Sequence, residues 1–145
     1  RLQVVKFLIE NGANINKADN SGETPLILSC RKGHLEIVKF LIQKGANIDI
    51  NKADNDGKTP LHMACEKRNN LELVKFLIEN GADINKADND GKTPLHMAFE
   101  KVYLEIVEFL IEKGANIEQK NQGPTKEVIG PNSSLGPEII NELTK

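Results

Sequence analysis

Two histidines stand at matching places in a repeated sequence pattern. His62 and His96 each follow the letters T-P-L, and 34 residues separate them. Imidazole nitrogens bind zinc at about 2 Å, so histidines at regular spacing are a pattern that could hold a metal. If successive copies pack at about 10 Å, the spacing of neighbouring helices, the two rings cannot reach one ion. No Cys/His pair supplies further ligands, and Ile27 takes the same place in an earlier copy. The sequence therefore predicts neither a metal site nor any other cofactor.

Two cysteines also share one place in the pattern. Cys30 and Cys65 occupy it in successive copies, and Phe99 takes it in the next copy. A position filled by Cys, Cys and Phe indicates apolar packing. The spacing between copies exceeds the roughly 4.4–6.8 Å between Cα atoms that a disulfide usually needs, so we expect buried free thiols. Two cysteines in 145 residues do not make a disulfide framework, which favours an intracellular, cytoplasmic protein.

No arrangement of residues typical of an enzyme occurs in the sequence. The glycines stand singly, and the phosphate-binding patterns G-x-x-x-x-G-K-[ST] and G-x-G-x-x-G are both missing. Acidic residues recur at fixed places in the pattern, which indicates solvated faces rather than a catalytic carboxylate pair. His34, in G-H-L-E-I-V, is expected to form hydrogen bonds within its loop. We predict that the protein is not an enzyme.

The overall composition disfavours nucleic acid and membranes as partners. Charged residues make up 28% of the chain and the net charge is −2, whereas nucleic-acid-binding domains usually show a basic patch. Aromatic residues make up 4% and Trp is absent, which leaves few platforms for stacking on single-stranded nucleic acid. No apolar run approaches the length needed to span a bilayer, and the given sequence does not open on a basic-then-apolar pattern, which says little about the parent protein. The chain opens at Arg1 without Met, so we expect it to be a piece of a longer protein.

An exact internal repeat indicates the architecture. The letters N-K-A-D-N-D-G-K-T-P-L-H-M-A occur twice, at Asn51–Ala64 and at Asn85–Ala98. Together with glycines in the context G-A-N/D-I, they indicate a period of 33 residues, and such periods are typical of stacked solenoids. Two residues are inserted after Gly45, around Asp49–Ile50, and one is inserted near Arg68.

Each copy predicts two helices followed by a polar finger. In T-P-L, Thr is typical of a helix N-cap and Pro of the first helical position, so a first helix is expected from Thr24 to about Arg31. A second helix begins near Leu35 and is apolar over more than half of its circumference, so it needs neighbours on several sides. We expect Gly45 to end it in the left-handed conformation. The stretch that follows is rich in turn formers and predicts an extended finger.

These motifs resemble ankyrin repeats. The patterns D-x-x-G-x-T-P-L-H, L-E-I-V-x-F-L-I and G-A-D/N-I-N match that family over about residues 1–120. The resemblance implies an all-α fold, an ankyrin-repeat solenoid of stacked helix–loop–helix units with β-turn fingers. It also implies a structural role for the repeated histidines, through hydrogen bonds to the backbone and to neighbouring loops, and a module that binds other proteins.

The copies divide the chain into an array and a tail. The array comprises a partial first repeat and three full repeats, at residues 1–18, 19–53, 54–87 and 88–120. Residues 121–145 are expected to form a degenerate C-terminal capping repeat, in which Pro137 begins an amphipathic turn that covers the last apolar edge. The alternative for this tail is a flexible linker rich in Gly, Pro and Ser.

The resemblance places partner recognition on a concave face formed by the finger tips and the exposed side of the first helices. Carried across by position, this face contains Asn20, Ser21, Glu23, Arg31, Lys32, Asn55, Asp56, Lys58, Glu66, Lys67, Asn89, Asp90, Lys92, Glu100 and Lys101. It is a ladder of alternating charge without aromatic anchors, so we expect weak binding or a charged, extended partner protein. The alternative is that these residues only keep the stack soluble.

Three departures from the repeat add to these expectations. The two-residue insertion preserves the alternation of an extended finger, so we expect that finger to be longer and to protrude, with Asp49 among the partner-binding residues. Val102 stands where Gly33 suggests a left-handed conformation, which a β-branched residue does not tolerate, so the fourth repeat should differ locally. Tyr103, the only tyrosine, is either an exposed hot-spot residue or covered packing.

These features together predict a protein–protein interaction scaffold. At the N-terminal edge the first repeat lacks its first helix, which leaves Val4, Val5, Leu8 and Ile9 partly bare, so we expect self-association through that edge. The alternative function is that of a regulatory or targeting segment of a larger multidomain enzyme, channel or effector. An engineered array is a further alternative, against which the uneven insertions and the irregular tail argue.

Overall fold

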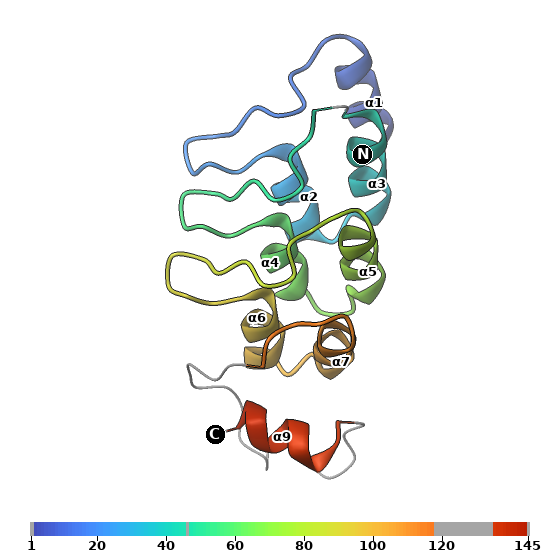
Figure 1. The fold of residues 1–145 in the computed structure, drawn as a ribbon. Coiled ribbons are helices and arrows are strands. Elements are labelled where there is room, and N and C mark those ends of the chain that lie inside the picture. The colour runs from blue at the N-terminus through green and yellow to red at the C-terminus, as the bar shows by residue number, and fades with distance from the viewer. Residues whose placement is uncertain (1, 46, 118–134, 145) are drawn as a thin grey trace.

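The computed structural model describes residues 2–45, 47–117 and 135–144, and within them all regular structure is helical. The helices are α1 (Leu2–Glu10), α2 (Pro25–Lys32), α3 (Leu35–Lys44), α4 (Pro60–Cys65), α5 (Leu71–Glu79), α6 (Pro94–Glu100), α7 (Leu104–Glu112) and α9 (Pro137–Leu143). One row holds α2, α4 and α6, a second row holds α1, α3, α5 and α7, and three fingers project beside the first row (Figure 1). Neighbours within each row are in contact, and each first-row helix also packs on the second-row helix of its own repeat. The predicted all-α solenoid is confirmed.

Threonine and proline begin each first-row helix, as the T-P-L motif predicts. Thr24, Thr59 and Thr93 are extended N-caps whose side-chain oxygens accept a hydrogen bond from the backbone N–H of the third helical residue. In α4 and α6 this residue is histidine, and its Nδ1 accepts from the threonine N–H at 3.1 and 3.0 Å. Both helices therefore begin with a capping box in which His replaces the usual Glu or Gln.

The second-row helices end in two different ways. Gly81 and Gly114 follow α5 and α7 in the left-handed conformation, with φ of 97° and 102°. Gly45 was predicted to do the same after α3, and this prediction is wrong. Its φ is −91°, and its N–H donates to Leu41 O at 2.8 Å, which adds one more helical hydrogen bond. The two inserted residues let the chain reverse further on, at Ile48, whose N–H donates to Gly45 O at 2.9 Å. Glycine is still needed, because a Cβ there would lie 2.8 Å from Leu41 O.

The inserted residues are absorbed before the finger begins. Lys52 N–H donates to Asp49 O at 3.2 Å in the turn that opens the second finger, and the matching bond in the first finger joins Lys17 to Asn14. Asp49 therefore corresponds to Asn14, and the insertion lies between Gly45 and Asp49. The prediction of a longer, protruding finger is wrong, because hydrogen bonds between the tips keep all three fingers in register.

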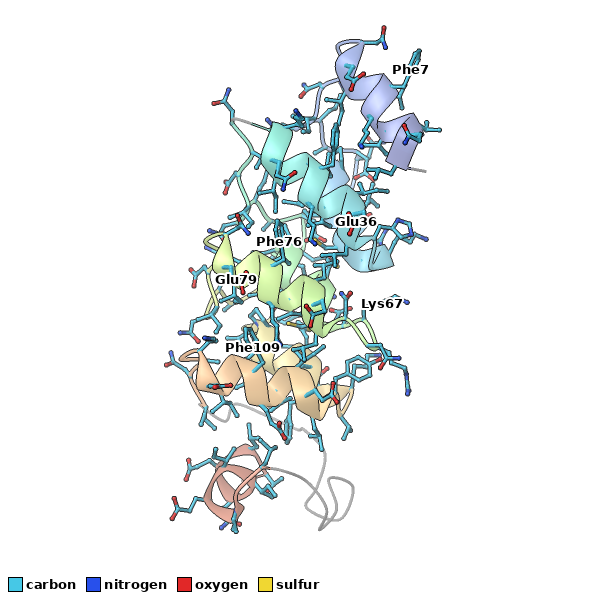
Figure 2. All side chains as sticks on the ribbon, turned by 90° about the vertical axis from the view of Figure 1, so that its right-hand side faces the viewer. Phe7, Glu36, Lys67, Phe76, Glu79 and Phe109 are labelled. Atoms are coloured by element: carbon cyan, nitrogen blue, oxygen red, sulfur yellow. The ribbon has the colours of Figure 1, made fainter. Side chains whose placement is uncertain are left out.

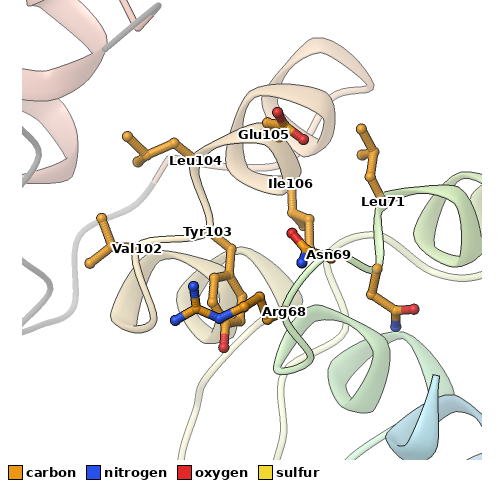
Figure 3. Close-up of a pocket in the computed structure, with 9 residues that line it drawn as sticks. Arg68, Asn69, Leu71, Val102, Tyr103, Leu104, Glu105 and Ile106 are labelled. Carbon is orange, nitrogen blue, oxygen red and sulfur yellow. The ribbon is translucent and has the colours of Figure 1, made fainter. Parts of the chain in front are cut away.

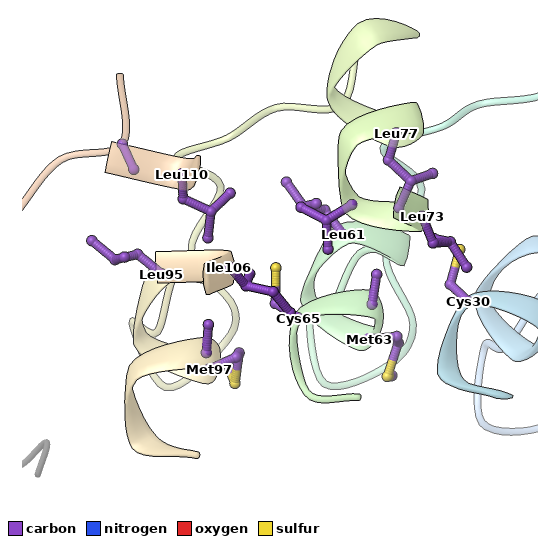
Figure 4. Close-up of a cluster of buried hydrophobic side chains, with 14 of the residues drawn as sticks. Cys30, Leu61, Met63, Cys65, Leu73, Leu77, Leu95, Met97, Ile106 and Leu110 are labelled. Carbon is purple, nitrogen blue, oxygen red and sulfur yellow. The ribbon is translucent and has the colours of Figure 1, made fainter. Parts of the chain in front are cut away.

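The core is one continuous apolar cluster that follows the stack between the two rows (Figure 4). Leu61, Leu73 and Leu77 are among its fully buried members. Cys30 and Cys65 lie inside the same cluster as free thiols, and burial raises the pKa of both thiols above the ordinary value. The prediction of buried free thiols is confirmed.

The N-terminal end of the stack exposes part of α1. Val4, Phe7 and Leu8 are 60, 64 and 51% exposed. Val5 and Ile9 are partly buried where α1 packs on α3, so they are partly bare, as predicted. The exposed edge also includes Phe7, which the sequence reasoning missed.

A short helix lies at the C-terminal end of the stack. It begins at Pro137, as the sequence predicts, and its residue Leu143 is buried. Ile139 and Ile140 pack against the core cluster, and Leu135 before the helix is also buried. Because residues 118–134 lie outside the described part of the chain, the choice between a degenerate repeat and a linker stays a prediction.

Lysine and phenylalanine side chains form a ladder along the second row of helices, on the face where Figure 2 shows Phe76 and Phe109. Each lysine lies over the ring of the phenylalanine in the next repeat, which stabilises a repeat junction by about 0.5–1 kcal/mol when exposed. The pairs are Lys6–Phe40, Lys39–Phe76 and Lys75–Phe109, at 5.6, 5.9 and 5.7 Å from nitrogen to ring centroid. The K-F dipeptide that recurs in three repeats is the sequence signal for this ladder.

Candidate interaction face

Each finger tip is a tight turn organised by one aspartate. In the third repeat Asp54 N–H donates to Lys58 O at 2.9 Å, and Asp54 Oδ1 accepts from the N–H groups of Asp56 and Lys58, both at 2.9 Å. Asp19 and Asp88 accept the matching bonds in their own fingers. A short carboxylate that satisfies two backbone donors holds the turn in one conformation. The tips are therefore preformed.

Successive tips are joined to one another by asparagine. Asn55 donates from its N–H to Ser21 O at 3.0 Å and from Nδ2 to Asn20 O at 2.9 Å. Asn89 makes the same two bonds to the preceding tip, at 2.9 Å to Asp56 O and 3.0 Å to Asn55 O. The three tips thus form one row. We call the surface made by these tips and the exposed side of α2, α4 and α6 the finger face.

His62 connects the first helix of the third repeat to the finger of the fourth. Its Nδ1 accepts from Thr59 N–H, which makes Nε2 the protonated donor, and Nε2 lies 2.8 Å from Lys92 O. Burial lowers the pKa of His62 below its ordinary value, so the ring is neutral near pH 7. The structural role expected for this histidine, through backbone and a neighbouring loop, is confirmed.

Oppositely charged residues eight positions apart form an ion pair in every full repeat. Each pair joins the base of a finger to the end of a first helix, and the signs are exchanged in the second repeat. The pairs are Glu23–Arg31, Lys58–Glu66 at 3.2 Å and Lys92–Glu100 at 2.8 Å. Burial alone would lower the pKa of Lys58, but the charge and hydrogen bond of Glu66, together with the charges of Asp88 and Asp54, outweigh it and raise that pKa. The hydrogen bond to Glu100 raises the pKa of Lys92.

These six residues were all predicted to bind a partner, and the structure pairs them with one another. Sequence reasoning missed the pairing, although the signal is visible as opposite charges eight residues apart. The other charged residues of the face are exposed, and among the described residues none of them forms an ion pair: Lys32, Asp56, Lys67, Asp90 and Lys101. Asp49 lies elsewhere, in the turn that opens the second finger, where its Oδ1 accepts from Asn51 N–H at 2.9 Å.

Two similar cavities lie between successive fingers. One, of about 300 Å³, lies between the second and third repeats, and the other, of about 220 Å³, between the third and fourth. Corresponding residues line both. They are Asp56, Lys58, Met63 and Glu66 in the first cavity and Asp90, Lys92, Met97 and Glu100 in the second. The finger face is therefore a row of repeated hollows with charged rims.

A third cavity, of about 210 Å³, lies at the loops that follow α4 and α6 (Figure 3). Tyr103 lines it, is half-buried and packs partly on the core. The guanidinium of Arg68 lies 5.8 Å from the centroid of the Tyr103 ring. The ring is therefore partly covered by packing, and its role as a hot-spot residue stays a prediction. Tyr103 is remote in the fold from the finger tips.

Val102, beside Tyr103, contradicts the expectation of a different local geometry. Its φ is 60°, against 73° at Gly33 and 57° at Asn69. Val102 N–H donates to Phe99 O at 3.0 Å, as Gly33 N–H donates to its own helix end at 3.1 Å. The stack therefore imposes the left-handed conformation on a β-branched residue, and the resulting strain is located at this loop.

The finger face presents charged and polar side chains, which act by ion pairing and hydrogen bonding. Within the part of the chain that the structure describes, no three His, Cys, Asp or Glu side chains are grouped so as to hold a metal ion. No helix in residues 2–45, 47–117 or 135–144 is long and apolar enough to cross a bilayer.

Comparison with known families agrees with the repeat geometry. A family model described as ankyrin repeats in three copies matches residues 1–88 and, overlapping them, residues 49–121. The chain belongs to the ankyrin-repeat family. Ankyrin repeats are generally protein–protein interaction modules and are typically not catalytic. The predicted class of function therefore holds for this ankyrin-repeat chain, and the residues that contact a partner are proposals.

Proposed function

We propose that this ankyrin-repeat protein is a scaffold that binds a partner protein through its finger face. The proposed contact residues are Asn20, Ser21, Glu23, Arg31, Lys32, Asn55, Asp56, Lys58, Glu66, Lys67, Asn89, Asp90, Lys92, Glu100 and Lys101, with Asp49 and Tyr103 as outlying candidates. The row of preformed finger tips, hydrogen-bonded in register, is the observation that carries the proposal. A surface that is already ordered loses little conformational entropy on binding.

The chemistry of the face determines the kind of recognition we propose. Interfaces draw most of their energy from Trp, Tyr and Arg, and the finger tips contain none of them. Charged groups contribute specificity and association rate more than affinity. We therefore propose a partner held with modest affinity that weakens as salt is added, because exposed charges are screened within about 8–10 Å at physiological ionic strength.

Affinity capture with charge-reversed variants tests this proposal. One variant combines Lys67→Glu with Lys101→Glu, and another combines Asp56→Lys with Asp90→Lys. These four side chains are exposed and unpaired within the described residues, so reversing them removes no internal ion pair. Glu79→Lys, on the outer face of α5, is the matched control (Figure 2).

We expect a partner that is retained by the unmodified protein and by Glu79→Lys to be lost by at least one finger-face variant. Circular dichroism should show the same helicity in all of them. Retention by both finger-face variants together with loss by Glu79→Lys would place recognition on the second row of helices and refute the proposal.

The exposed edge of α1 supports a second proposal, self-association. Val4, Phe7 and Leu8 are each more than half exposed on one short helix, and contiguous apolar surface of this kind often marks a contact site. Sedimentation velocity over a concentration series should show dimers that Phe7→Glu abolishes. A clean monomer at high concentration would contradict this second proposal.

The cellular location of the protein and its role within a larger protein are also proposals. The buried free thiols Cys30 and Cys65 support an intracellular, cytoplasmic location, because thiols persist in a reducing compartment. The same finger face would also serve a regulatory or targeting segment of a larger multidomain enzyme, channel or effector. That role is distinguished by an effect of partner binding on the activity of the attached protein.

A further inference from the structure

The two cavities of the finger face repeat one chemistry at one repeat's distance. In both of them carboxylates outnumber cations: four against two in the first cavity, and four against three in the second. Each also contains a nearly buried methionine, Met63 at 5% and Met97 at 4% exposure. The cavities therefore combine an apolar wall with an excess of negative charge.

One carboxylate in each cavity lies outside the ion pairs, although the charge of the one in the second cavity, Asp90, acts on Lys92 from a distance. The glutamates at the helix ends pair with the finger-base lysines, and the aspartates that organise the tips accept backbone N–H groups. Asp56 and Asp90 are exposed, and no ion pair or side-chain hydrogen bond joins either carboxylate to another described residue. Lys101 also lines the second cavity and reduces its negative charge without cancelling it. Each cavity consequently attracts a cation.

A long cationic side chain fits both parts of such a cavity. Its methylene stem can lie along Met63 or Met97, while its charged end reaches Asp56 or Asp90. Arginine suits this geometry better than lysine, because its planar fork binds a carboxylate through two parallel hydrogen bonds.

The distance between the cavities indicates the backbone that carries these side chains. Successive repeats are separated by about 10 Å, the spacing of packed helices. Polyproline II rises about 3.1 Å per residue with three residues per turn, so every third side chain lies on one face about 9.3 Å apart. A β-strand repeats its face after about 6.6–6.8 Å, which does not match. An amphipathic helix needs an apolar groove, and the tips carry only polar side chains.

We propose that the finger face binds an extended, polyproline-type segment of a partner protein with arginine at every third residue. Two successive arginines enter the cavities beside Asp56 and Asp90. This inference rests on the proposed function, since it assigns a partner class to the same face. It adds the sign of the partner's charge and the period at which that charge recurs.

Fluorescence anisotropy with defined peptides tests the inference. The probe is a labelled twelve-residue peptide of four Arg-Pro-Pro units. One comparator has the same composition with its four arginines adjacent, and a second consists of four Glu-Pro-Pro units. The protein variants are Asp56→Asn, Asp90→Asn and the matched outer-face control Glu79→Gln, each of which removes one negative charge. The carboxylates that organise the two turns are those of Asp54 and Asp88, so both variants should fold.

We expect the Arg-Pro-Pro peptide to bind about tenfold more tightly than the peptide with adjacent arginines. Asp56→Asn and Asp90→Asn should each weaken it several-fold, and Glu79→Gln should leave it unchanged. Equal binding of the two arginine peptides, an equal effect of Glu79→Gln, or no binding at all would overturn the inference.

The outcomes also separate this inference from the proposed function. Preference for the Glu-Pro-Pro peptide, lost on Lys67→Glu with Lys101→Glu, would refute a cationic partner and leave the finger face as the recognition surface. If captured partners depend on the finger face but no arginine peptide binds, only the partner class is wrong. If neither depends on that face, both proposals fail.

Discussion

Replacing Val102 by glycine should stabilise the fold. Val102 has a φ of 60° in a loop where the second repeat has glycine at 73° and the third has asparagine at 57°. The loop bonds from Val102 N–H to Phe99 O and from Tyr103 N–H to Ala98 O are both 3.0 Å. The second repeat makes the matching bonds from Gly33 N–H to Cys30 O at 3.1 Å and from His34 N–H to Ser29 O at 3.0 Å, so the left-handed conformation belongs to this way of ending the first helix. Valine bears the steric cost of that conformation, and glycine does not.

The size of the effect follows from three contributions. The left-handed conformation costs a residue with a Cβ about 1–2 kcal/mol. Glycine loses about 0.5–1 kcal/mol more backbone entropy on folding, which offsets part of the gain. The valine side chain is half-exposed and is not among the partly buried residues that pack on the core, so little burial is lost. We expect a net gain of about 0.5–1 kcal/mol for Val102→Gly.

Urea unfolding followed by circular dichroism measures this gain. With a slope of about 2 kcal/mol per molar urea, the midpoint should rise by about 0.25–0.5 M. Val102→Ala keeps a Cβ and most of the strain, so it should gain less. The reverse exchange, Gly33→Val, should destabilise the protein, because a Cβ there would also lie 3.2 Å from Lys67 Cε. A lower midpoint for Val102→Gly than for Val102→Ala would show that valine packing outweighs the strain, and would refute the reasoning.

Three further predictions concern other parts of the stack. Burial holds the pKa of His62 below its unfolded value of about 6.5, so as the pH falls the histidine is protonated in the unfolded state first. The unfolding free energy should therefore decrease as the pH drops below about 6.5. Urea midpoints at pH 7.5 and 5 should therefore differ less in His62→Gln than in the original chain; an unchanged pH slope would argue against this assignment. Cys30 and Cys65, buried with raised thiol pKa, should react with a thiol reagent only at the rate of unfolding, and rapid labelling of the folded protein would contradict their placement. A double-mutant cycle on Lys92 and Glu100, both partly exposed, should give a coupling below about 1 kcal/mol that shrinks with salt, whereas a larger, salt-independent value would contradict a surface ion pair.

Much of the fold could be predicted from short stretches of sequence, because the interactions that produce it are local. A threonine followed by proline caps a helix whatever lies around it, and Thr24, Thr59 and Thr93 all do so. The shared position of Cys30 and Cys65 with a phenylalanine indicated packing, since each copy of a solenoid faces the same neighbours. The period of the repeat was therefore sufficient for the architecture and for the buried thiols.

The candidate site was predicted less completely, because the partners of its charges lie in another element. The sequence showed a ladder of charges on the finger face, and the folded chain shows that those eight residues apart neutralise one another. Lys58 meets Glu66 because a finger base and a helix end are brought together, and the result leaves Asp56 as the uncompensated charge of its cavity. The sign of the proposed partner's charge and the spacing of its charged residues depend on which carboxylates remain outside the internal ion pairs.

The sequence by itself determined the repeating unit, its helix starts and its membership of the ankyrin-repeat family, since these depend on contacts within a unit or between identical units. Tertiary structure decided the exceptions. Gly45 leaves the left-handed conformation because the inserted residues turn the chain later, and Val102 enters it because its loop bonds to the end of α6 require that conformation. In both places the path of the surrounding chain and its hydrogen bonds outweigh the conformational preference of the single residue.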